Sequence, residues 1–219
     1  MTLLGHIVEN VSGRRVDQYL TQEIFQKLDM KNSRYYFTED LIGKASKGYI
    51  FSKDQYTERK PIRVTTHPAG SILSTADDMA KFLIGHLDGR KILKKETLKN
   101  MQQTHFTHYD EMLGNAYGFY EVMRGSNKVI EHGGNTPTFA SLLSLYPEKK
   151  LGFFISCNSN EGGTLLREDF ANELYEYFLG KSSVREKVLD TAEKEINIED
   201  YVGEYALTRI TKGPPLKIL

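Results

Sequence analysis

Four short runs rich in β-branched and aromatic residues, separated by turn residues, occupy most of the stretch from Tyr117 to Asn158. This alternation predicts strands joined by tight turns, and it limits the chain to folds that contain a sheet. Gly125–Asn127 and Pro147–Lys150 are expected to form two of the turns. The last run is almost continuously apolar, which predicts a strand buried on both faces. The expected strands cover residues 117–123, 129–131, 139–146 and 151–157.

The residues between the second and third expected strands carry the strongest functional signal. The second strand is expected to stop at His132, and Gly133 and Gly134 follow directly. A histidine at a strand end beside glycines places a titratable ring next to backbone that another molecule can approach closely. An ordinary strand-end histidine that only bonds a neighbouring group is the alternative when His132 is considered alone.

Helical periodicity is found on both sides of these strands. The first residues have an apolar repeat that predicts a helix with one buried face, ended by Ser12–Gly13. No capping residue precedes this helix, so we expect the chain to be the C-terminal part of a longer one. Ser74 or Thr75 is expected to cap a later helix whose first turn carries two aspartates. Helices are expected at residues 1–11, 15–30, 75–88, 95–102 and 165–179, and an irregular loop or lid at 31–66.

The composition excludes several classes of protein. With 39% hydrophobic and 26% charged residues, the chain is typical of globular proteins and not of disordered or membrane chains. Lys+Arg and Asp+Glu both number 29, so the charge balance gives no sign of a nucleic-acid or anionic membrane partner. The single cysteine, Cys157, cannot form an internal disulfide, and its apolar surroundings favour a buried structural role over a reactive thiol.

Three blocks of sequence resemble the serine β-lactamase-like family, which includes class C β-lactamases, D,D-peptidases and related esterases. Residues 2–13 look like the helix that follows the family's Tyr-x-Asn motif. Residues 68–82 begin Pro-Ala-Gly-Ser and are similar to the family's Pro-Ala-Gly-Gly-type segment. Residues 132–137, His-Gly-Gly-Asn-Thr-Pro, look like the third active-site motif, which is Lys-Thr-Gly in the lactamases and often His-x-Gly in this branch. The resemblance covers residues 1–180.

The resemblance implies an α/β fold of the α+β type, in which an antiparallel sheet is flanked by helices and the family's N-terminal strands and helix are missing. It also implies acyl transfer. His132 would take the motif's cation or hydrogen-bond-donor position, and Gly133 and Gly134 would permit close substrate approach. The backbone N–H of Asn135 would be one oxyanion-hole donor, and Thr136 would bind substrate. The implied partner is a small-molecule or peptide substrate, with no nucleic acid, cofactor or metal.

The sequence departs from the family pattern in one decisive respect. No serine has lysine three positions later, and no tyrosine has asparagine or serine two positions later. The resemblance places both motifs upstream of Met1. We therefore expect the chain to be the C-terminal portion of a serine hydrolase acting on a β-lactam, a peptidoglycan peptide or an ester, and to be inactive alone. The alternative is a non-catalytic pseudoenzyme or binding module that keeps the cleft wall without the nucleophile.

Further expectations concern the end of the chain and its surfaces. Residues 1–180 are expected to form the hydrolase portion, 181–197 a charged linker, and 198–219 the start of a truncated β domain. Without the family's missing strands, the strand at 151–157 would be a hydrophobic edge, so self-association through that edge is expected. The cellular compartment stays open: intact family members are usually exported or membrane-associated, whereas this chain shows no signal peptide or transmembrane pattern.

Three other groups of residues suggest sites only weakly. His105 and His108, with Asp110 nearby, could suggest a metal site, but their i, i+3 spacing lies in an irregular stretch that specifies no further ligand, so no metal site is expected. His67 precedes Pro68, and a structural turn is favoured there over a place in the cleft. The tyrosines between residues 35 and 56 fit either a substrate-contacting lid or a solvated loop.

Overall fold

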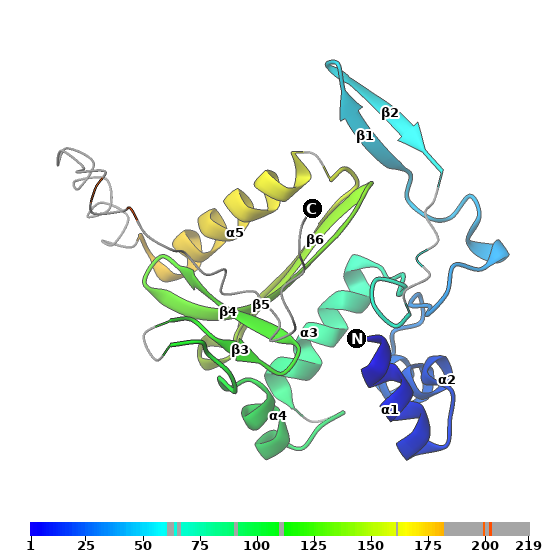
Figure 1. The fold of residues 1–219 in the computed structure, drawn as a ribbon, viewed down its shortest axis with the longest axis horizontal. Helices are drawn as coiled ribbons and strands as arrows, with labels where there is room; N and C mark the ends of the chain where they lie inside the picture. The colour runs from blue at the N-terminus through cyan, green and yellow to red at the C-terminus, as the bar shows by residue number, and fades with distance from the viewer. Residues whose placement is uncertain are drawn as a thin grey trace.

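A computed structural model describes residues 1–60, 64, 67–89, 92–109, 112–160, 162–181, 199 and 202. The expected linker at 181–197 and the expected start of a further domain at 198–219 therefore lie almost wholly outside the described residues. The described chain combines helices with antiparallel sheets, as the sequence predicts (Figure 1). None of the described helices is long and apolar enough to cross a membrane.

The centre of the molecule is a five-stranded sheet in the order β3-β4-β5-β6-β7, and all neighbouring strands are antiparallel. The order of the strands in the sheet follows their order in the chain, because short turns join each of the five strands to the next. The strands are β3 (Asn115–Ala116), β4 (Phe119–Arg124), β5 (Asn127–Thr136), β6 (Phe139–Tyr146) and β7 (Leu151–Cys157).

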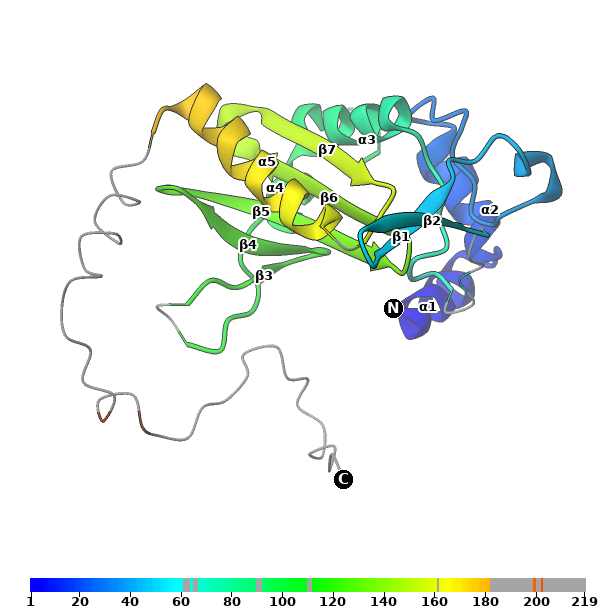
Figure 2. The same cartoon turned by 90° about the horizontal axis from the view of Figure 1, so that it is seen from above.

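Helices cover both faces of this sheet (Figure 2). On one face, Leu83 of α3 (Ala76–Asp88) packs against Ile130, Leu143 and Leu145 of the central strands. On the other face, Tyr175 of α5 (Gly163–Leu179) packs with side chains of β5 and β6. The central strands β5 and β6 therefore send alternate side chains into two different cores, which is the pattern of a sheet between two helical layers.

The expected helix starts and stops are found where local signals are strong. The side chain of Thr75 accepts a hydrogen bond from the backbone N–H of Asp78 and so caps α3. Gly13 and Gly89 end α1 and α3 with positive φ angles of 66°, a conformation that glycine adopts without strain. The remaining helices are α1 (Thr2–Ser12), α2 (Val16–Leu20), which continues into a π-helical turn (Thr21–Phe25), and α4 (Lys95–Met101).

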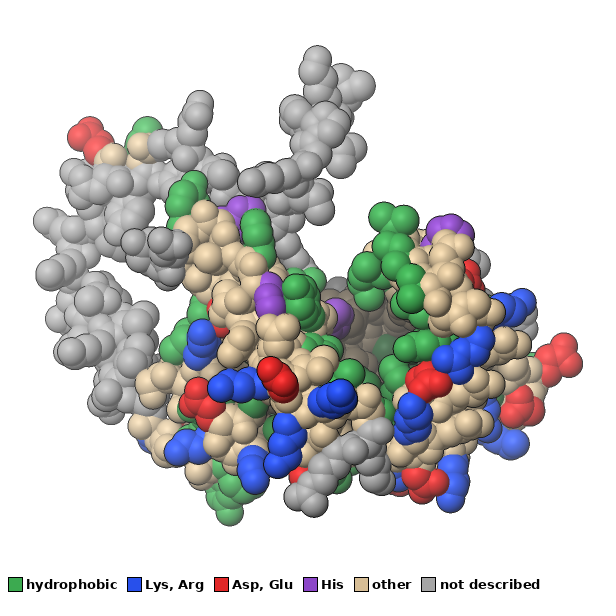
Figure 3. Space-filling model, turned by 90° about the horizontal axis from the view of Figure 1, so that it is seen from below, with side chains coloured by type: hydrophobic (Ala, Val, Ile, Leu, Met, Phe, Trp, Pro, Cys, Tyr) green, Lys and Arg blue, Asp and Glu red, His purple; other side chains and the backbone are tan. Residues whose placement is uncertain are grey.

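The expectation of a buried face on the first helix is wrong for the described chain. Leu3, Leu4, Ile7 and Val11 of α1 are all exposed. The helix contacts α2, and its Gly5 lies against Pro68, where a Cβ would be 3.0 Å from the proline ring. Figure 3 shows a hollow in the surface between the part of the molecule that contains α1 and α2 and the part that contains β3 and β4. Hydrophobic side chains lie on both sides of this hollow.

The segment expected to be irregular contains a hairpin. Strands β1 (Gly48–Ser52) and β2 (Gln55–Arg59) form a separate two-stranded sheet. Lys53 and Asp54 form its two-residue turn with φ angles of 51° and 60°. This turn conformation matches the twist of a hairpin, but glycine or asparagine usually marks it in a sequence. The hairpin was missed because neither residue gives that signal.

Strand β7 is covered on its faces but open at its edge. Helices α3 and α5 both contact it, one on each face, yet none of its residues reaches full burial. Both faces of the strand are covered, as predicted, but its residues are at most partly buried. The reason is that β7 is the last strand in the order of the described sheet and has a strand neighbour on one side only.

Candidate active site

The residues singled out by the sequence lie on a strand and not in a turn. β5 continues through His132, Gly133, Gly134 and Asn135 to Thr136, so the expectation that the strand stops at His132 is wrong. β6 pairs with this whole stretch, from the pair His132–Leu143 to the pair Thr136–Phe139. The two glycines allow a turn but do not require one, and the pairing keeps them extended.

Within the described sheet, the second half of β5 has a neighbouring strand on one side only. β4 pairs with β5 from Asn127 to Glu131 and no further, whereas β6 pairs with it up to Thr136. The residues from His132 to Asn135 are exposed, in contrast to Val129, Ile130 and Glu131 immediately before them. The strand thus passes from a central position in the sheet to an open edge that another chain or ligand can approach.

The direction of the backbone N–H of Asn135 follows from the register. One nitrogen of Arg167, Nη1, bonds both Gly134 O and Ser141 O, at 3.3 and 2.7 Å. Two carbonyls of opposite residues lie this close only when both point into the space between the strands, as in a hydrogen-bonded pair. The next pair, Asn135–Ala140, is then a non-hydrogen-bonded pair, in which the backbone N–H and C=O groups point away from the partner strand. The N–H of Asn135 therefore points away from β6, toward the open edge.

His132 is held at the corner where β4 begins. Its Nδ1 donates a hydrogen bond to the carbonyl oxygen of Gly118 at 2.6 Å, and its ring centroid is 5.8 Å from that of Tyr120. Because a carbonyl oxygen can only accept, the proton must sit on Nδ1. In the neutral ring Nε2 is then a hydrogen-bond acceptor, and it becomes a donor only when the ring is protonated.

Alternation along β5 separates the side chains of the site. His132, Gly134 and Thr136 share the face of the sheet that carries Ile130 and α3, whereas Gly133 and Asn135 face α5. The side chain of Asn135 is consequently turned away from His132. Any joint role of these two residues must use the backbone of Asn135.

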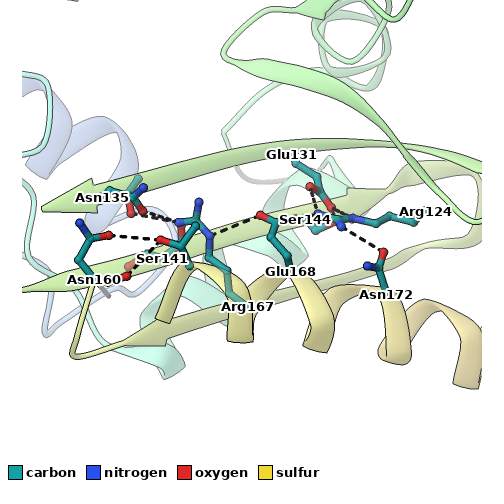
Figure 4. Close-up of polar contacts among 11 residues, drawn as sticks. Arg124, Glu131, Asn135, Ser141, Ser144, Asn160, Arg167, Glu168 and Asn172 are labelled. Atoms are coloured by element: carbon teal, nitrogen blue, oxygen red, sulfur yellow. Dashed lines mark hydrogen bonds and ion pairs between the residues drawn. The ribbon is translucent and has the colours of Figure 1, made fainter. Parts of the chain in front are cut away.

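Arg167 of α5 was not predicted as part of the site. Its side chain is only 9% exposed and lies directly under residues 133–135 of β5 (Figure 4). Besides the two carbonyls, Nη1 donates to Oδ1 of Asn135 at 2.7 Å. A Cβ added to Gly133 would lie 3.3 Å from Arg167 Nη2, so the glycine leaves room for the guanidinium. Its position four residues before Ala171 and eight before Tyr175, both buried, is the sequence signal that marks it as inward-facing.

A second buried polar group continues from Arg167 along the same face (Figure 4). Arg124 and Glu131 form an ion pair of 2.6 Å, and Glu168 contacts both Arg124, at 2.7 Å, and Arg167, at 3.5 Å. Ser144 donates to Glu131 at 2.8 Å. These contacts fix β4, β5, β6 and α5 relative to one another and so give the open stretch of β5 a rigid base.

The weaker candidates are occupied in structural contacts. His105 Nε2 bonds Asn100 O at 2.7 Å, and its ring stacks on Tyr117 with centroids 3.8 Å apart. His67 lies in a turn and stacks on Tyr35, whose side chain is buried. Asp110 lies outside the described residues. Within the described ranges, no group of three His, Cys, Asp or Glu side chains is placed to hold a metal ion.

Comparisons with known proteins agree with this architecture. The model of a family described as Beta-lactamase matches residues 1–176. The protein flp of Staphylococcus aureus (strain MW2) is 24% identical over 162 residues, which are 72% of this chain and 32% of that protein. The chain thus spans about a third of the length of this curated relative.

Three solved structures show a similar fold. The octameric penicillin-binding protein homologue from Pyrococcus abyssi has a TM-score of 0.69 and 26% identity, over 88% of this chain and 45% of that chain. A class C β-lactamase from Rhodobacter sphaeroides has a TM-score of 0.61 and 20% identity, over 80% and 58%. The D-amino acid amidase from Ochrobactrum anthropi SV3 has a TM-score of 0.60 and 22% identity, over 78% and 54%. The expected fold class, an antiparallel sheet flanked by helices, is confirmed.

Proposed function

The chain belongs to the β-lactamase family, and on this basis we propose that it forms one wall of the acyl-binding cleft of a serine hydrolase. The substrate class is a β-lactam, a peptidoglycan peptide or an ester, because all three carry an acyl group that a serine can attack. The wall is the open stretch of β5 from His132 to Thr136. Metal and cofactor have no part in this proposal.

The observation that carries the proposal is the direction of the backbone N–H of Asn135. This N–H is directed away from β6 at a point beyond the end of β4, where a substrate carbonyl can be placed against the strand edge. A backbone N–H fixed in this way stabilises the negative charge that develops on the carbonyl oxygen during acyl transfer. Loss of one such donor typically costs about 2.7–4 kcal/mol of transition-state stabilisation.

We assign His132 the task of holding or moving a proton beside this donor. The bond from Nδ1 to Gly118 O fixes the ring and leaves Nε2 for the substrate or for another catalytic group. As a neutral ring it accepts a proton at Nε2, and as a cation it supplies a positive hydrogen-bond donor. Both forms suit the position that lysine has in related hydrolases.

The remaining residues of the stretch shape the approach. A Cβ added to Gly134 would meet nothing within 4 Å, so this glycine leaves open space on the face that carries His132. Thr136 Oγ1 accepts the backbone N–H of Phe139 at 3.0 Å, which holds the end of the strand while its hydroxyl proton stays available for substrate.

The nucleophile is the part that these 219 residues do not contain, since no Ser-x-x-Lys is present in the sequence. We therefore propose that the 219-residue chain alone forms no acyl-enzyme. Purified chain incubated with a fluorescent penicillin and with a chromogenic ester should give neither covalent labelling nor turnover. Sequencing the DNA upstream of Met1 should reveal an in-frame Tyr-x-Asn and, further upstream, Ser-x-x-Lys.

A longer product with both motifs should be labelled by the penicillin or should turn over the ester, and replacement of its motif serine by alanine should abolish this. Upstream sequence that contains neither motif would refute the hydrolase proposal. It would favour the second candidate, a non-catalytic binding module that uses the same wall, which is motivated by the absence of both motifs. Reversible binding of penicillin or stem peptide without turnover would support the binding module over the hydrolase. Covalent labelling of the 219-residue chain would refute the binding module.

A further inference from the structure

We propose that Arg167 is a positioning residue that orients and polarises the peptide group between Gly134 and Asn135. This inference rests on the proposed function, because it concerns the same N–H that is assigned to the oxyanion site. The carbonyl oxygen of Gly134 and the N–H of Asn135 belong to one peptide unit. Arg167 Nη1 donates to that carbonyl oxygen at 3.3 Å, and the N–H at the other side of the unit faces the open edge.

Polarisation follows from the charge of the donor. A hydrogen bond from a guanidinium withdraws electron density from the carbonyl oxygen, and resonance in the peptide passes the effect to the nitrogen. The N–H of Asn135 thereby becomes a stronger donor, as in any chain of hydrogen bonds that polarise one another. Burial of Arg167 strengthens this effect, because little water screens its charge.

Orientation follows from the other two bonds of the same nitrogen. Ser141 O and Asn135 Oδ1 both lie 2.7 Å from the same Nη1. Because Nη1 carries two hydrogen atoms, one of its N–H groups is shared between the Gly134 carbonyl oxygen and one of these acceptors. One cation therefore holds the backbone on both strands of the hairpin and the side chain of the residue whose N–H is used. The carboxylate of Glu168 lies 3.5 Å from Nε, whereas the contacts with β5 and β6 are made by Nη1.

Gly133 is the sequence feature that makes this arrangement fit. Its hydrogen atoms occupy the place where a Cβ would stand 3.3 to 3.7 Å from the guanidinium atoms. A larger side chain on this face of the strand would displace the arginine from the carbonyl oxygens. Glycine is thus favoured here by the close approach of Arg167 and not by backbone conformation, since its φ angle is not positive.

The test is nuclear magnetic resonance of the ¹³C,¹⁵N-labelled 219-residue chain with Arg167→Gln and Arg167→Lys. In Arg167→Gln the carbonyl carbon of Gly134 and the amide nitrogen of Asn135 should both move upfield, because the charged donor is gone. Arg167→Lys keeps a cation and should restore part of both shifts. Arg15→Gln, which removes an exposed arginine, is the matched control and should move neither resonance.

Amide hydrogen exchange separates this role from simple support of the hairpin. Loss of the charged hydrogen bonds should speed exchange at Gly134 and Ser141 by about ten- to a hundredfold. Faster exchange with unchanged Gly134 and Asn135 resonances would mean that Arg167 only supports the fold, and would overturn the proposal. If Arg167→Gln does not fold, Arg167→Lys decides, and resonances identical to those of the wild type would overturn it. None of these measurements needs turnover. Whether the chain is catalytically active therefore tests the proposed function and leaves the role of Arg167 untouched.

Discussion

The guanidinium of Arg124 donates two parallel hydrogen bonds to the carboxylate of Glu131, from Nε at 2.9 Å and from Nη2 at 2.6 Å. The two side chains are only 6% and 5% exposed, and they join neighbouring strands under α5. Burial acts to lower the pKa of Arg124, but the bonds to Glu131 and Glu168 outweigh it and hold the pKa above its ordinary value. Arg124 therefore stays protonated beside Glu131.

Breaking this pair on one side should destabilise the protein more than removing both partners. Arg124→Met leaves the Glu131 carboxylate buried without its cation, which should lower the free energy of unfolding by about 3–5 kcal/mol. The double variant Arg124→Met, Glu131→Leu should lose less, because no buried charge is left unpaired. Urea titration of the single and double variants measures both values. A double variant less stable than Arg124→Met would contradict this account.

His86 should make stability fall as the pH is lowered. Its side chain is buried against Phe82, and burial lowers its pKa, although the hydrogen bond to Phe82 O acts in the opposite direction. Between the unfolded pKa of about 6.5 and the lower folded pKa, only the unfolded chain binds the proton. The contribution of His86 to stability is thus present above about pH 6.5 and is lost as the pH falls toward the folded pKa.

The comparison that isolates this effect uses His86→Phe and His6→Gln. The first should flatten the dependence of the unfolding free energy on pH below about 6.5, since a neutral ring replaces the titrating one. The second changes an exposed histidine and should leave the slope as in the wild type. Equal slopes for the wild type and His86→Phe, from denaturant titrations at several pH values, would show that another group is responsible.

Local signals in the sequence predicted the elements that depend on a few neighbouring residues. Thr75 caps α3, and Gly13 and Gly89 end two helices as expected, because each of these features is decided within one helical turn. The strands at 139–146 and 151–157 match β6 and β7 for the same reason, since their apolar runs are bounded by turn residues.

The features that the sequence did not reveal depend on contacts between residues that are far apart in the chain. β5 continues through Gly133 and Gly134 because β6 pairs with it, and the local preferences of two glycines do not predict this. Arg167 joins the site from a helix 32 residues beyond Asn135. The family motif located the right stretch of chain, but its geometry and the residue beneath it became visible only in the folded molecule.

The two neighbouring glycines of the site should respond differently to alanine. A Cβ at Gly133 would press on Arg167 at 3.3 Å, whereas a Cβ at Gly134 meets nothing within 4 Å. Neither residue has a positive φ angle, so alanine fits both backbones. Gly134→Ala should leave the free energy of unfolding unchanged or raise it by up to about 1 kcal/mol, because alanine loses less entropy on folding.

Gly133→Ala should instead cost about 1–3 kcal/mol, because the methyl group overpacks a site where three hydrogen bonds hold the arginine in place. Each variant is the control for the other, since the two positions are adjacent on one strand and the substitution is the same. Urea midpoints measured side by side decide the matter. If Gly133→Ala is as stable as Gly134→Ala, the guanidinium is free to move and does not need the glycine.

The open edge of β7 leads to the last prediction, which concerns association between copies of the chain. β7 is the final strand of the described sheet, its sequence is almost wholly apolar, and β6 is its only strand partner in that sheet. Unpaired backbone groups along such an edge can pair with another strand. We propose that the 219-residue chain self-associates through β7. Light scattering after gel filtration should then show a mass that rises with concentration.

A lysine on this strand should reduce the association, because charged side chains on an edge strand oppose pairing with a second edge. Ser156 is exposed on β7, and its bond to Ser141 Oγ lies at the surface, so Ser156→Lys should cost little stability. Ser126→Lys adds the same charge in the exposed turn between β4 and β5 and should leave the association unchanged. A wild-type chain that stays monomeric at all concentrations and unfolds in one cooperative transition would refute the proposal. Equal masses for the two lysine variants would place the contact elsewhere on the surface.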